Sequence, residues 1–496
     1  MSAAPRPQPP DVPAAPAAGG ENPAKRADRL DPAVVRLCAV LVVGALAPLL
    51  DSTVVNVALH TLGRDLDAPV GTVQWVVTGY LLALAAVIPV TGWTVARFGA
   101  RRTWLTALLV FLAGSALCGI ARDVPELIVF RVVQGVGGGL MLPVLQTLVL
   151  RAAGRDRIGR VMAVVTLPAL VGPILGPVLG GLIAGHASWR WIFLLNVPLC
   201  ALALLLAWRT VPADPPAERR PLDLTGLVLL PPALAAVVYG LARVGGRAPL
   251  AGFGAADVLL PLVAGVLLLA AFARHATRTP TPLLNLRLLR TRSFTASAAL
   301  LFLSGFGLFG AMLLLPLYYQ QVRGQGVIAA GLLLAPQGLG SLLARGAGRL
   351  TDRLGPRPVV LAATAVTALG TVPFLFAGPH TGTLPLSAAL VLRGAGLSAA
   401  NMAVMAGAFR DLEPSQIPDG SGLTRIAQQL GGSFGTALLA VLLERGVAAH
   451  STVTAFQNTF GWALAFTLLA ALPALLLPRT RRGRPRTAPA RPGSRG

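Results

Sequence analysis

The stretch GWTVARFGARR, residues 92–102, returns in altered form as GRLTDRLGPR, residues 348–357. The two copies lie 256 residues apart. A second pair of similar stretches, FRVVQGVGGG at 130–139 and LRGAGLSAAN at 392–401, has an offset of 262 residues. Two pairs at nearly one offset indicate an internal duplication. We therefore expect each half of the chain to build the same structure once.

Long apolar runs flank both copies of the repeat. Of the 496 residues, 54% are hydrophobic and 12% are charged, whereas about 25% of the residues in a soluble domain are charged. This composition excludes a soluble enzyme. A membrane-spanning helix needs about 20 apolar residues, and runs of this kind predict fourteen spans. Their predicted limits are 34–58, 72–96, 104–121, 125–150, 160–184, 190–211, 224–243, 255–273, 293–321, 327–349, 358–378, 384–409, 420–443 and 459–478.

The repeat unit is six spans, because the second span corresponds to the tenth and the fourth to the twelfth. We expect an all-α polytopic membrane protein in which two six-helix bundles are separated by two extra helices. Parallel repeats of this kind place a substrate site between the two halves, near the middle of the membrane. The predicted domains are a disordered cytoplasmic tail at 1–33, a first bundle at 34–211, two inserted helices with a cytoplasmic loop at 212–292, a second bundle at 293–478 and a basic cytoplasmic tail at 479–496.

The formal net charge of +23 arises from 42 Lys and Arg against 19 Asp and Glu. If the N-terminus is cytoplasmic, most of the basic residues fall on the inner side of the predicted spans, as the positive-inside rule requires. The charge then reflects membrane orientation and does not indicate a nucleic-acid partner. Because the number of spans is even, we expect a multi-pass protein with both termini in the cytoplasm. The membrane is predicted to be a bacterial inner membrane, because Lys25 is the single lysine and such a bias is typical of a GC-rich genome.

Asp51 is the one acidic residue that falls well inside a predicted span. A carboxylate at that depth is costly unless it is protonated, paired or hydrated. Arg131 lies in the fourth span, and at about 1.5 Å per residue both side chains start roughly 10 Å below the outer interface. Equal depth would allow pairing, and protonation of Asp51 would then release Arg131. The alternative is structural, with a capped Asp51 and an arginine that bonds backbone carbonyls.

The two copies of the loop motif are candidate gates at the cytoplasmic face. Their glycines allow tight turns, and their charged side chains can bridge neighbouring helix ends. An alternative is that the arginines are only positive-inside anchors. The candidate gating residues are Gly92, Arg97, Gly99, Arg101 and Arg102 in the first copy and Gly348, Asp352, Arg353, Gly355 and Arg357 in the second.

Polar residues inside the spans are weak candidates for a substrate cavity, since they can equally be hydrogen bonds between helices. These candidates are Asn56, Gln134, Gln337 and Asn401. No metal site or cofactor is expected. The single lysine does not follow a glycine-rich turn, and none of the five histidines forms a metal-binding pair on a helix.

The chain resembles the fourteen-span drug/proton antiporters of the major facilitator superfamily, close to the EmrB/QacA group. The resemblance rests on four stretches: LLDSTVVNVALH at 49–60, the first loop motif at 92–102, the fourth-span motif at 130–139 and GPILGPVLGG at 172–181. Two positions depart from the family pattern. Ala96 stands where the loop motif usually has an acid, and His60 stands where the first motif usually ends in proline.

The resemblance implies a role for two further features. In the family, the arginine that matches Arg131 is implicated in proton transfer. The fifth-span motif is thought to form a hinge or a leak-tight seal, although a plain packing face would have the same glycine spacing. The residues of this antiporter helix motif are Gly172, Pro173, Gly176, Pro177, Gly180 and Gly181.

The sequence thus favours a proton-coupled efflux transporter that exports small lipophilic or cationic drugs by alternating access. One alternative is a dedicated exporter of a self-produced antibiotic or other metabolite. An alternative of another class is a polytopic membrane enzyme that acts on lipid, which would need acidic or histidine residues clustered at one membrane face. The expected partners are a small lipophilic substrate, protons and the lipid bilayer, whereas an adaptor protein would leave no mark in the sequence.

Overall fold

The structure is a computed structural model that describes residues 31–68, 70–153, 183, 187–214, 221–244 and 256–478. The described α-helices are α2 Pro32–Asp65, α3 Val70–Val87, α4 Thr91–Phe98, α5 Ala100–Ile120, α6 Val124–Ala153, α8 Arg190–Leu194, α9 Asn196–Thr210, α10 Leu224–Val244, α11 Ala256–Arg278, α12 Arg292–Leu317, α13 Val327–Leu333, α14 Ala335–Leu343, α15 Ala347–Leu354, α16 Pro356–Thr371, α17 Thr383–Phe409, α18 Ile417–Ala449, α19 Thr452–Leu469 and α20 Ala471–Ala474. Short helical segments join them at η1 Ile88–Val90, η4 Leu286–Arg290, η5 Tyr318–Val322, η6 Ala344–Gly346, η7 Val372–Leu375 and η8 Pro414–Gln416.

Within these described ranges, 12 helical segments are long and apolar enough to cross a membrane. The span expected at 327–349 is built from the shorter helices α13, α14 and α15. The span expected at 160–184 lies almost wholly outside the described residues. The helix count thus agrees approximately with the fourteen predicted spans.

Several predicted boundaries were wrong, among them the end of the first span, which was expected at 58 although α2 runs to Asp65. The last span was expected from 459, but α19 begins at Thr452, where Ser451 caps it by accepting a hydrogen bond from the backbone N–H of Thr454 at 3.2 Å. The polar residues of this first turn hid the helix from a search for apolar runs. Similarly, α18 extends beyond the expected 420–443 at both ends, from Ile417 to Ala449.

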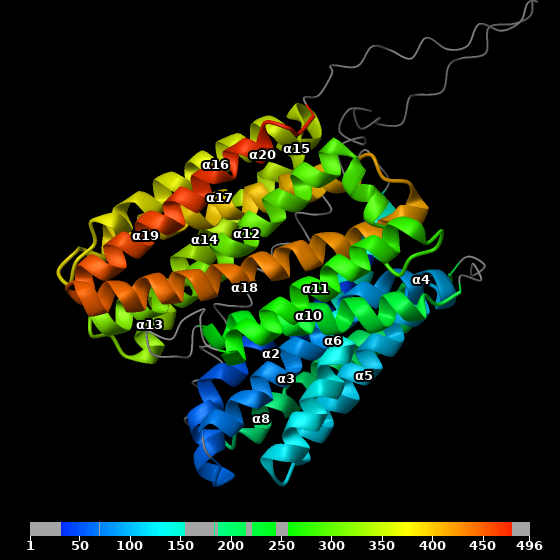
Figure 1. Ribbon diagram of the computed structural model, residues 1–496, viewed down its shortest axis with the longest axis horizontal. Helices are drawn as coiled ribbons and strands as arrows, with labels where there is room; N and C mark the ends of the chain where they lie inside the picture. Colours follow the sequence, from blue (N-terminus) through cyan, green and yellow to red (C-terminus); the bar gives the residue numbers. More distant parts are fainter. Residues whose placement is uncertain are drawn as a thin grey trace, which may run out of the picture.

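The helices form two groups, which we call the N-terminal bundle (α2 to α9) and the C-terminal bundle (α12 to α20) (Figure 1). The inserted helices α10 and α11 pack on each other, and α10 also contacts α3 of one bundle and α18 of the other. Helix α18 runs along the junction, where it contacts α4, α6 and α10 as well as its own neighbours α12 and α19. The insert therefore bridges the two bundles.

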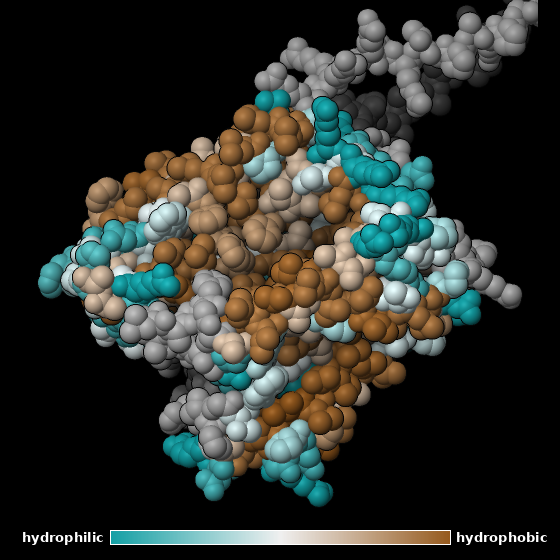
Figure 2. Space-filling model, viewed as in Figure 1, coloured by the Kyte–Doolittle hydropathy of each residue, from teal (hydrophilic) through white to brown (hydrophobic). Residues whose placement is uncertain are grey.

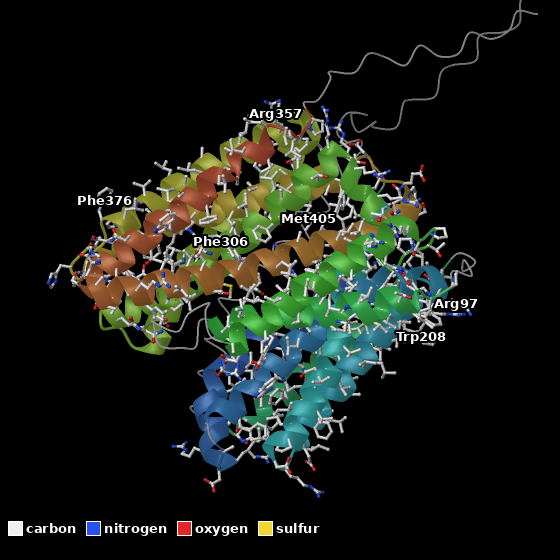
Figure 3. The ribbon with its side chains drawn as sticks, viewed as in Figure 1. Arg97, Trp208, Phe306, Arg357, Phe376 and Met405 are labelled. Carbon is white, nitrogen blue, oxygen red and sulfur yellow. The ribbon has the colours of Figure 1, made fainter. Side chains whose placement is uncertain are left out.

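The repeated loop forms the same turn twice. Gly99 ends α4 with φ 89° and ψ 158°, and Gly355 ends α15 with φ 87° and ψ 167°. This backbone region is open essentially to glycine alone. Arg97 and Arg357 lie at one end of the helices and Phe376 lies at the other (Figure 3). We call the end that carries both turns the arginine-rich end.

The apolar cores show where the bundles meet. At the arginine-rich end, one cluster of buried residues joins the two bundles and includes Leu41, Trp104, Phe294 and Phe409. At the opposite end, the described residues of each bundle form a separate core, around Phe193 in one and Phe374 in the other. The described helices are thus closed together at the arginine-rich end and have separate cores at the other.

Apolar side chains cover much of the outer face, and hydrophilic side chains gather near the helix ends (Figure 2). Helix α11 is the clearest case, because Leu260 and Leu267 are 69% and 64% exposed. Exposed apolar area on this scale is unfavourable in water and favourable in lipid. The surface therefore fits a protein embedded in a bilayer.

Close helix contacts fix the register of the repeat more sharply than the sequence does. A Cβ at Gly137 of α6 would lie 2.6 Å from the backbone nitrogen of Phe111 in α5. A Cβ at Gly396 of α17 would lie 2.6 Å from the backbone nitrogen of Thr367 in α16. Phe111 and Thr367 keep the loop offset of 256 residues, so Gly137 corresponds to Gly396.

A second glycine in each bundle gives the same register. A Cβ at Gly114 would crowd the backbone of Gln134, and a Cβ at Gly370 would crowd the backbone of Arg393. The residue equivalent to Arg393 is therefore Gln134, and the offset between α6 and α17 is 259 residues. The offset of 262 inferred by matching Arg131 with Arg393 was wrong by three residues.

Candidate functional site

Asp51 of α2 and Arg131 of α6 meet inside the N-terminal bundle. Their side chains are fully buried, and Arg131 Nη1 donates to Asp51 Oδ2 in an ion pair. The residues come from different helices and are 80 positions apart in the chain. A buried pair of this kind is kept only where both charges are well partnered, because removing either one leaves an uncompensated charge that costs about 3–5 kcal/mol.

The second oxygen of the Asp51 carboxylate is held by two amides. Oδ1 accepts from Gln134 Nε2 and from Asn196 Nδ2, each at 3.2 Å. Both amides also donate to Ser115 Oγ, at 3.1 and 3.2 Å. The carboxylate is thus surrounded by hydrogen-bond donors from α6 and α9.

Arg131 makes further contacts beyond the carboxylate. Its Nε donates to the carbonyl of Val76 at 3.0 Å, and its Nη1 also donates to Gln134 Oε1 at 2.8 Å. The guanidinium lies over the ring of Tyr80, 4.1 Å from the centroid. Its Nη2 is buried without a hydrogen-bond partner among the described residues. Loss of the Asp51 charge would therefore leave the arginine with an aromatic face, one carbonyl and one amide.

The sequence alone did not identify the whole network. Ser115 carries no sequence signal, because a lone serine in an apolar helix is common. Asn196 had only the general signal of an amide in a span. Asn196 reaches Asp51 because α9 packs beside α2, and Ser115 joins the network through the two amides because α5 packs on α6 and α9. Gln134, a candidate for lining a substrate cavity, is fully buried in this network.

At the arginine-rich end, an acid from another part of the chain completes the first loop motif. Asp214, which follows α9, accepts from the backbone N–H groups of Arg101 at 2.9 Å and Arg102 at 3.2 Å. Its carboxylate caps the first turn of α5, and no Cβ at Gly99 would fit beside it. The Arg101 side chain donates to the carbonyl of Trp208 at 2.6 Å. A carboxylate is thus present near this turn although the motif itself has Ala96 in place of its usual acid.

The first loop motif also contacts the C-terminal bundle. Gly92 of α4 packs so closely on Asp419 of α18 that a Cβ there would collide with the carboxylate. A Cβ at Gly422, one turn further along α18, would lie 3.7 Å from the carbonyl of Ile88. Asp419 was expected in a loop, but it lies in the first turn of α18 and is 4% exposed. These contacts hold the bundles together at the arginine-rich end.

The remaining candidate residues of the two loop motifs differ in how far they are exposed to solvent. Arg97 and Arg353 are exposed, whereas Asp352 and Arg357 are half-buried and Gly348 is buried. Arg97 and Arg357 lie at the same end of the molecule as Trp208 (Figure 3). The loop motifs are therefore at the same end of both bundles.

Gln337 and Asn401 lie in α14 and α17 of the C-terminal bundle, apart from the Asp51 pair. Asn401 is buried in α17 and donates to Ser304 Oγ at 3.4 Å. Gln337 accepts from Arg393 Nη1 at 3.2 Å, and Arg393 Nη2 donates to the carbonyl of Gly307 at 2.9 Å. Asn56 lies on α2. The antiporter helix motif lies outside the described residues: Gly172, Pro173, Gly176, Pro177, Gly180 and Gly181. In the part of the chain that the structure describes, no cluster of three or more His, Cys, Asp or Glu could hold a metal ion.

Comparisons with known proteins agree with this architecture. The family model of the Major Facilitator Superfamily matches residues 41–436 and 347–495. A protein named multidrug resistance protein B homolog, from Mycobacterium tuberculosis, is 41% identical over 420 residues, which cover 84% of this chain and 77% of that protein. The putative multidrug resistance protein MdtD of Escherichia fergusonii is 31% identical over 437 residues, covering 87% of this chain and 91% of the relative.

Two solved structures share the fold. The proton:xylose symporter XylE has a TM-score of 0.64 at 16% identity, with 90% of this chain and 96% of that chain covered. The human organic anion transporter MFSD10 has a TM-score of 0.61 at 17% identity, with 90% and 100% covered. Identities this low support the fold alone. The match of the family model over most of the sequence, together with the relatives that are 41% and 31% identical, shows that the chain belongs to the major facilitator superfamily.

Proposed function

We propose that this protein is a proton-coupled exporter of small lipophilic compounds, in which Asp51 carries the proton and Arg131 responds to its charge. The observation that carries the proposal is the fully buried ion pair between these residues in the N-terminal bundle. The names of the two relatives, both multidrug resistance proteins, support export of drug-like compounds.

The chemistry of the pair couples charge to helix movement. Protonation of Asp51 would remove the negative charge that balances Arg131, and a buried guanidinium without its counter-charge is unfavourable in a membrane. The pair bridges α2 and α6, and the amides of Gln134 and Asn196 connect it to α6 and α9. A change of charge therefore acts on three helices of one bundle at once.

We further propose that the arginine-rich end faces the cytoplasm of a bacterial cell. The support is the positive-inside rule applied to the two loop motifs. The contacts of Gly92 with Asp419 then close the cytoplasmic side. In the alternating-access cycle of a parallel repeat, separation of the two bundles at this contact would open the inner side.

The test is proton movement in proteoliposomes that contain the purified chain. When the lumen is more acidic than the outside, a lipophilic compound added outside should enter in exchange for protons, so the wild type should release protons in a compound-dependent way, and Asp51→Asn should abolish this release. Asp67→Asn is the matched control, because Asp67 is exposed and its φ of 46° is one that asparagine adopts readily. Unchanged release from Asp51→Asn, with normal insertion into the membrane, would refute the assignment.

A further inference from the structure

Three arginines of the described spans lie inside a bundle or near the junction of the two bundles. Among the described residues, one of the three is hydrogen-bonded to an acid. Arg131 pairs with Asp51. Among the described residues, Arg393 donates to Gln337 and to the carbonyl of Gly307, and Arg425 donates to Gln428 Oε1 at 3.0 Å. All of these other acceptors are neutral. Among the described residues, neither of these two arginines of the C-terminal bundle is hydrogen-bonded to a carboxylate.

Arg425 is the cation that faces the other bundle. It lies on α18, the helix that contacts α4, α6 and α10. Its side chain is half-buried, and Tyr80 of α3 lies nearby. The next residue along, Ile426, lines a small pocket between α18, α3 and α10 together with Ala85 and Leu234.

The position of Arg425 along α18 places it just beyond the closed contact. The bundles touch where Asp419 meets Gly92 and where Gly422 meets Ile88. Arg425 follows Gly422 by three residues, which is about 5 Å further from the arginine-rich end. It thus lies at the inner limit of the region between the bundles, where substrates bind in transporters with parallel repeats. From its position near the expected start of its span at 420, Arg425 is indistinguishable from the basic residues that follow the positive-inside rule.

We propose that Arg425 binds the acidic group of the transported compound, so that lipophilic organic anions are the preferred substrates. This inference rests on the proposed export function and names its substrate class. A guanidinium in a membrane without a counter-charge is unfavourable. A carboxylate or sulfonate neutralises it and accepts up to two parallel hydrogen bonds, which makes this one of the stronger polar contacts. Arginine at the same position repels a cationic compound.

Apolar side chains lie next to Arg425 along α18 and on the helices facing it, in a small pocket whose lining does not include Arg425 itself. Leu430 and Val238, from α18 and α10, line the same small pocket as Ile426. The ring of Tyr80 lies against Arg131, which is paired with Asp51. Asp51 is therefore paired with Arg131, and Arg425 is available to pair with the acidic group of the substrate.

The experiment compares three probes that share one lipophilic body. Pyrenebutyrate is an anion, pyrenebutanol is neutral and pyrenebutyl-trimethylammonium is a cation. Their binding to the full chain in nanodiscs of phosphatidylcholine is measured by energy transfer from tryptophan to pyrene, with empty nanodiscs subtracted. We expect the anion to bind more tightly than the alcohol by on the order of tenfold, as one charge-assisted hydrogen-bonded contact provides, and the cation to bind no more tightly than the alcohol.

Variants of Arg425 separate charge from packing. R425Q should reduce anion binding to the level of the alcohol and leave the alcohol unchanged, whereas R425K should keep most of the preference for the anion. Equal binding of anion and alcohol to the wild type, or a preference that survives in R425Q, would overturn the proposal. If R425Q loses all binding, R425K decides: a retained preference supports the proposal, and a lost preference with normal alcohol binding overturns it.

The two proposals fail separately. Binding in nanodiscs needs no gradient, so Asp51→Asn should keep the preference for the anion while proton movement is lost. Proton movement that depends on Asp51, without any preference for the anion, would overturn only the substrate class. A clear preference for the anion beside proton movement that does not depend on Asp51 would overturn only the proton carrier.

Discussion

Gln134 of α6 and Arg393 of α17 occupy equivalent positions in the two bundles. The amide of Gln134 bonds the carboxylate of Asp51 and accepts from Arg131. The guanidinium of Arg393 bonds the neutral Gln337 and a backbone carbonyl. The duplicated framework thus carries an acid–base pair in one described half, and a cation among neutral acceptors in the other. We infer that proton coupling and substrate charge are handled by different bundles.

Replacement of Gln134 by leucine should damage coupling. Gln134→Leu removes one donor to Asp51, one to Ser115 and one acceptor of Arg131. Leaving buried polar groups without partners costs about 1–3 kcal/mol each. We expect compound-driven proton movement in proteoliposomes to fall by about tenfold or more, because the ionised form of Asp51 loses support.

Gln337→Leu is the matched control for this prediction. It removes the acceptor of Arg393 but touches no acid. We expect lower thermal stability with proton movement retained. Equal loss of proton movement in both variants would show that the amide of Gln134 acts through general packing.

The register of the repeat gives a second prediction. Gly137→Ala and Gly396→Ala each place a methyl group against the backbone of the neighbouring helix. Backbone cannot move aside as a flexible side chain can, and overpacking of this kind costs about 1–3 kcal/mol. Both variants should unfold at lower temperature in detergent, by similar amounts. Gly307→Ala should melt like the wild type, because nothing lies within 4 Å of a Cβ at Gly307.

Much of the architecture could be predicted from composition and spacing. Apolar runs located the helices, and the depth of Asp51 and Arg131 below one interface predicted that they could meet. The register of α17 could not be predicted in this way. Similarity between residues had matched the two arginines, whereas helix packing matches the glycines Gly137 and Gly396, which make the same close backbone contact in each bundle.

The contacts that a sequence cannot reveal are those between elements distant in the chain. Asp214 caps α5 across 113 residues, and nothing in its proline-rich segment marks it as a cap. Asn196 reaches Asp51 across 145 residues. Asp419 was placed outside its helix because a search for apolar runs starts a span too late when its first turn is polar. These residues became visible only when the helices were placed in space.

The closed contact between the bundles should open when Gly92 is enlarged. Gly92→Ala places a methyl group where the carboxylate of Asp419 lies, so α4 and α18 must separate. Ile88 is 1% exposed beside this contact. An Ile88→Cys reporter should therefore react several-fold faster with a membrane-impermeant maleimide in inside-out vesicles when Gly92→Ala is present.

Two features make this labelling test specific. The native thiols Cys38, Cys118 and Cys200 are all buried, so the background is low. Gly346→Ala, also at the arginine-rich end, adds a methyl group to open space and should leave labelling unchanged. Labelling of the reporter that does not respond to Gly92→Ala would mean that this glycine does not maintain the closure.

The inserted helices should be sensitive to acid through Asp223. Its Oδ1 accepts from the backbone N–H of Gly226 at 2.9 Å and bonds His275 Nε2 at 2.8 Å, and its Oδ2 accepts from the backbone N–H of Leu283 at 2.9 Å. Burial raises the pKa of Asp223, but these hydrogen bonds to its charged form outweigh burial. The pKa therefore lies below its ordinary value of 3.8.

A lowered pKa fixes the sign of the pH dependence. The folded protein binds a proton at Asp223 less readily than the unfolded chain does, so this carboxylate stabilises the fold fully above about pH 5. That contribution is lost as pH falls below 3.8 and through the lower pKa of the folded state. Asp223→Asn should therefore melt below the wild type at about pH 7, with the difference shrinking toward about pH 3. Melting followed by tryptophan fluorescence measures this difference. If it is the same at both pH values, the side chain stabilises the junction of α10 and α11 by packing and not by charge.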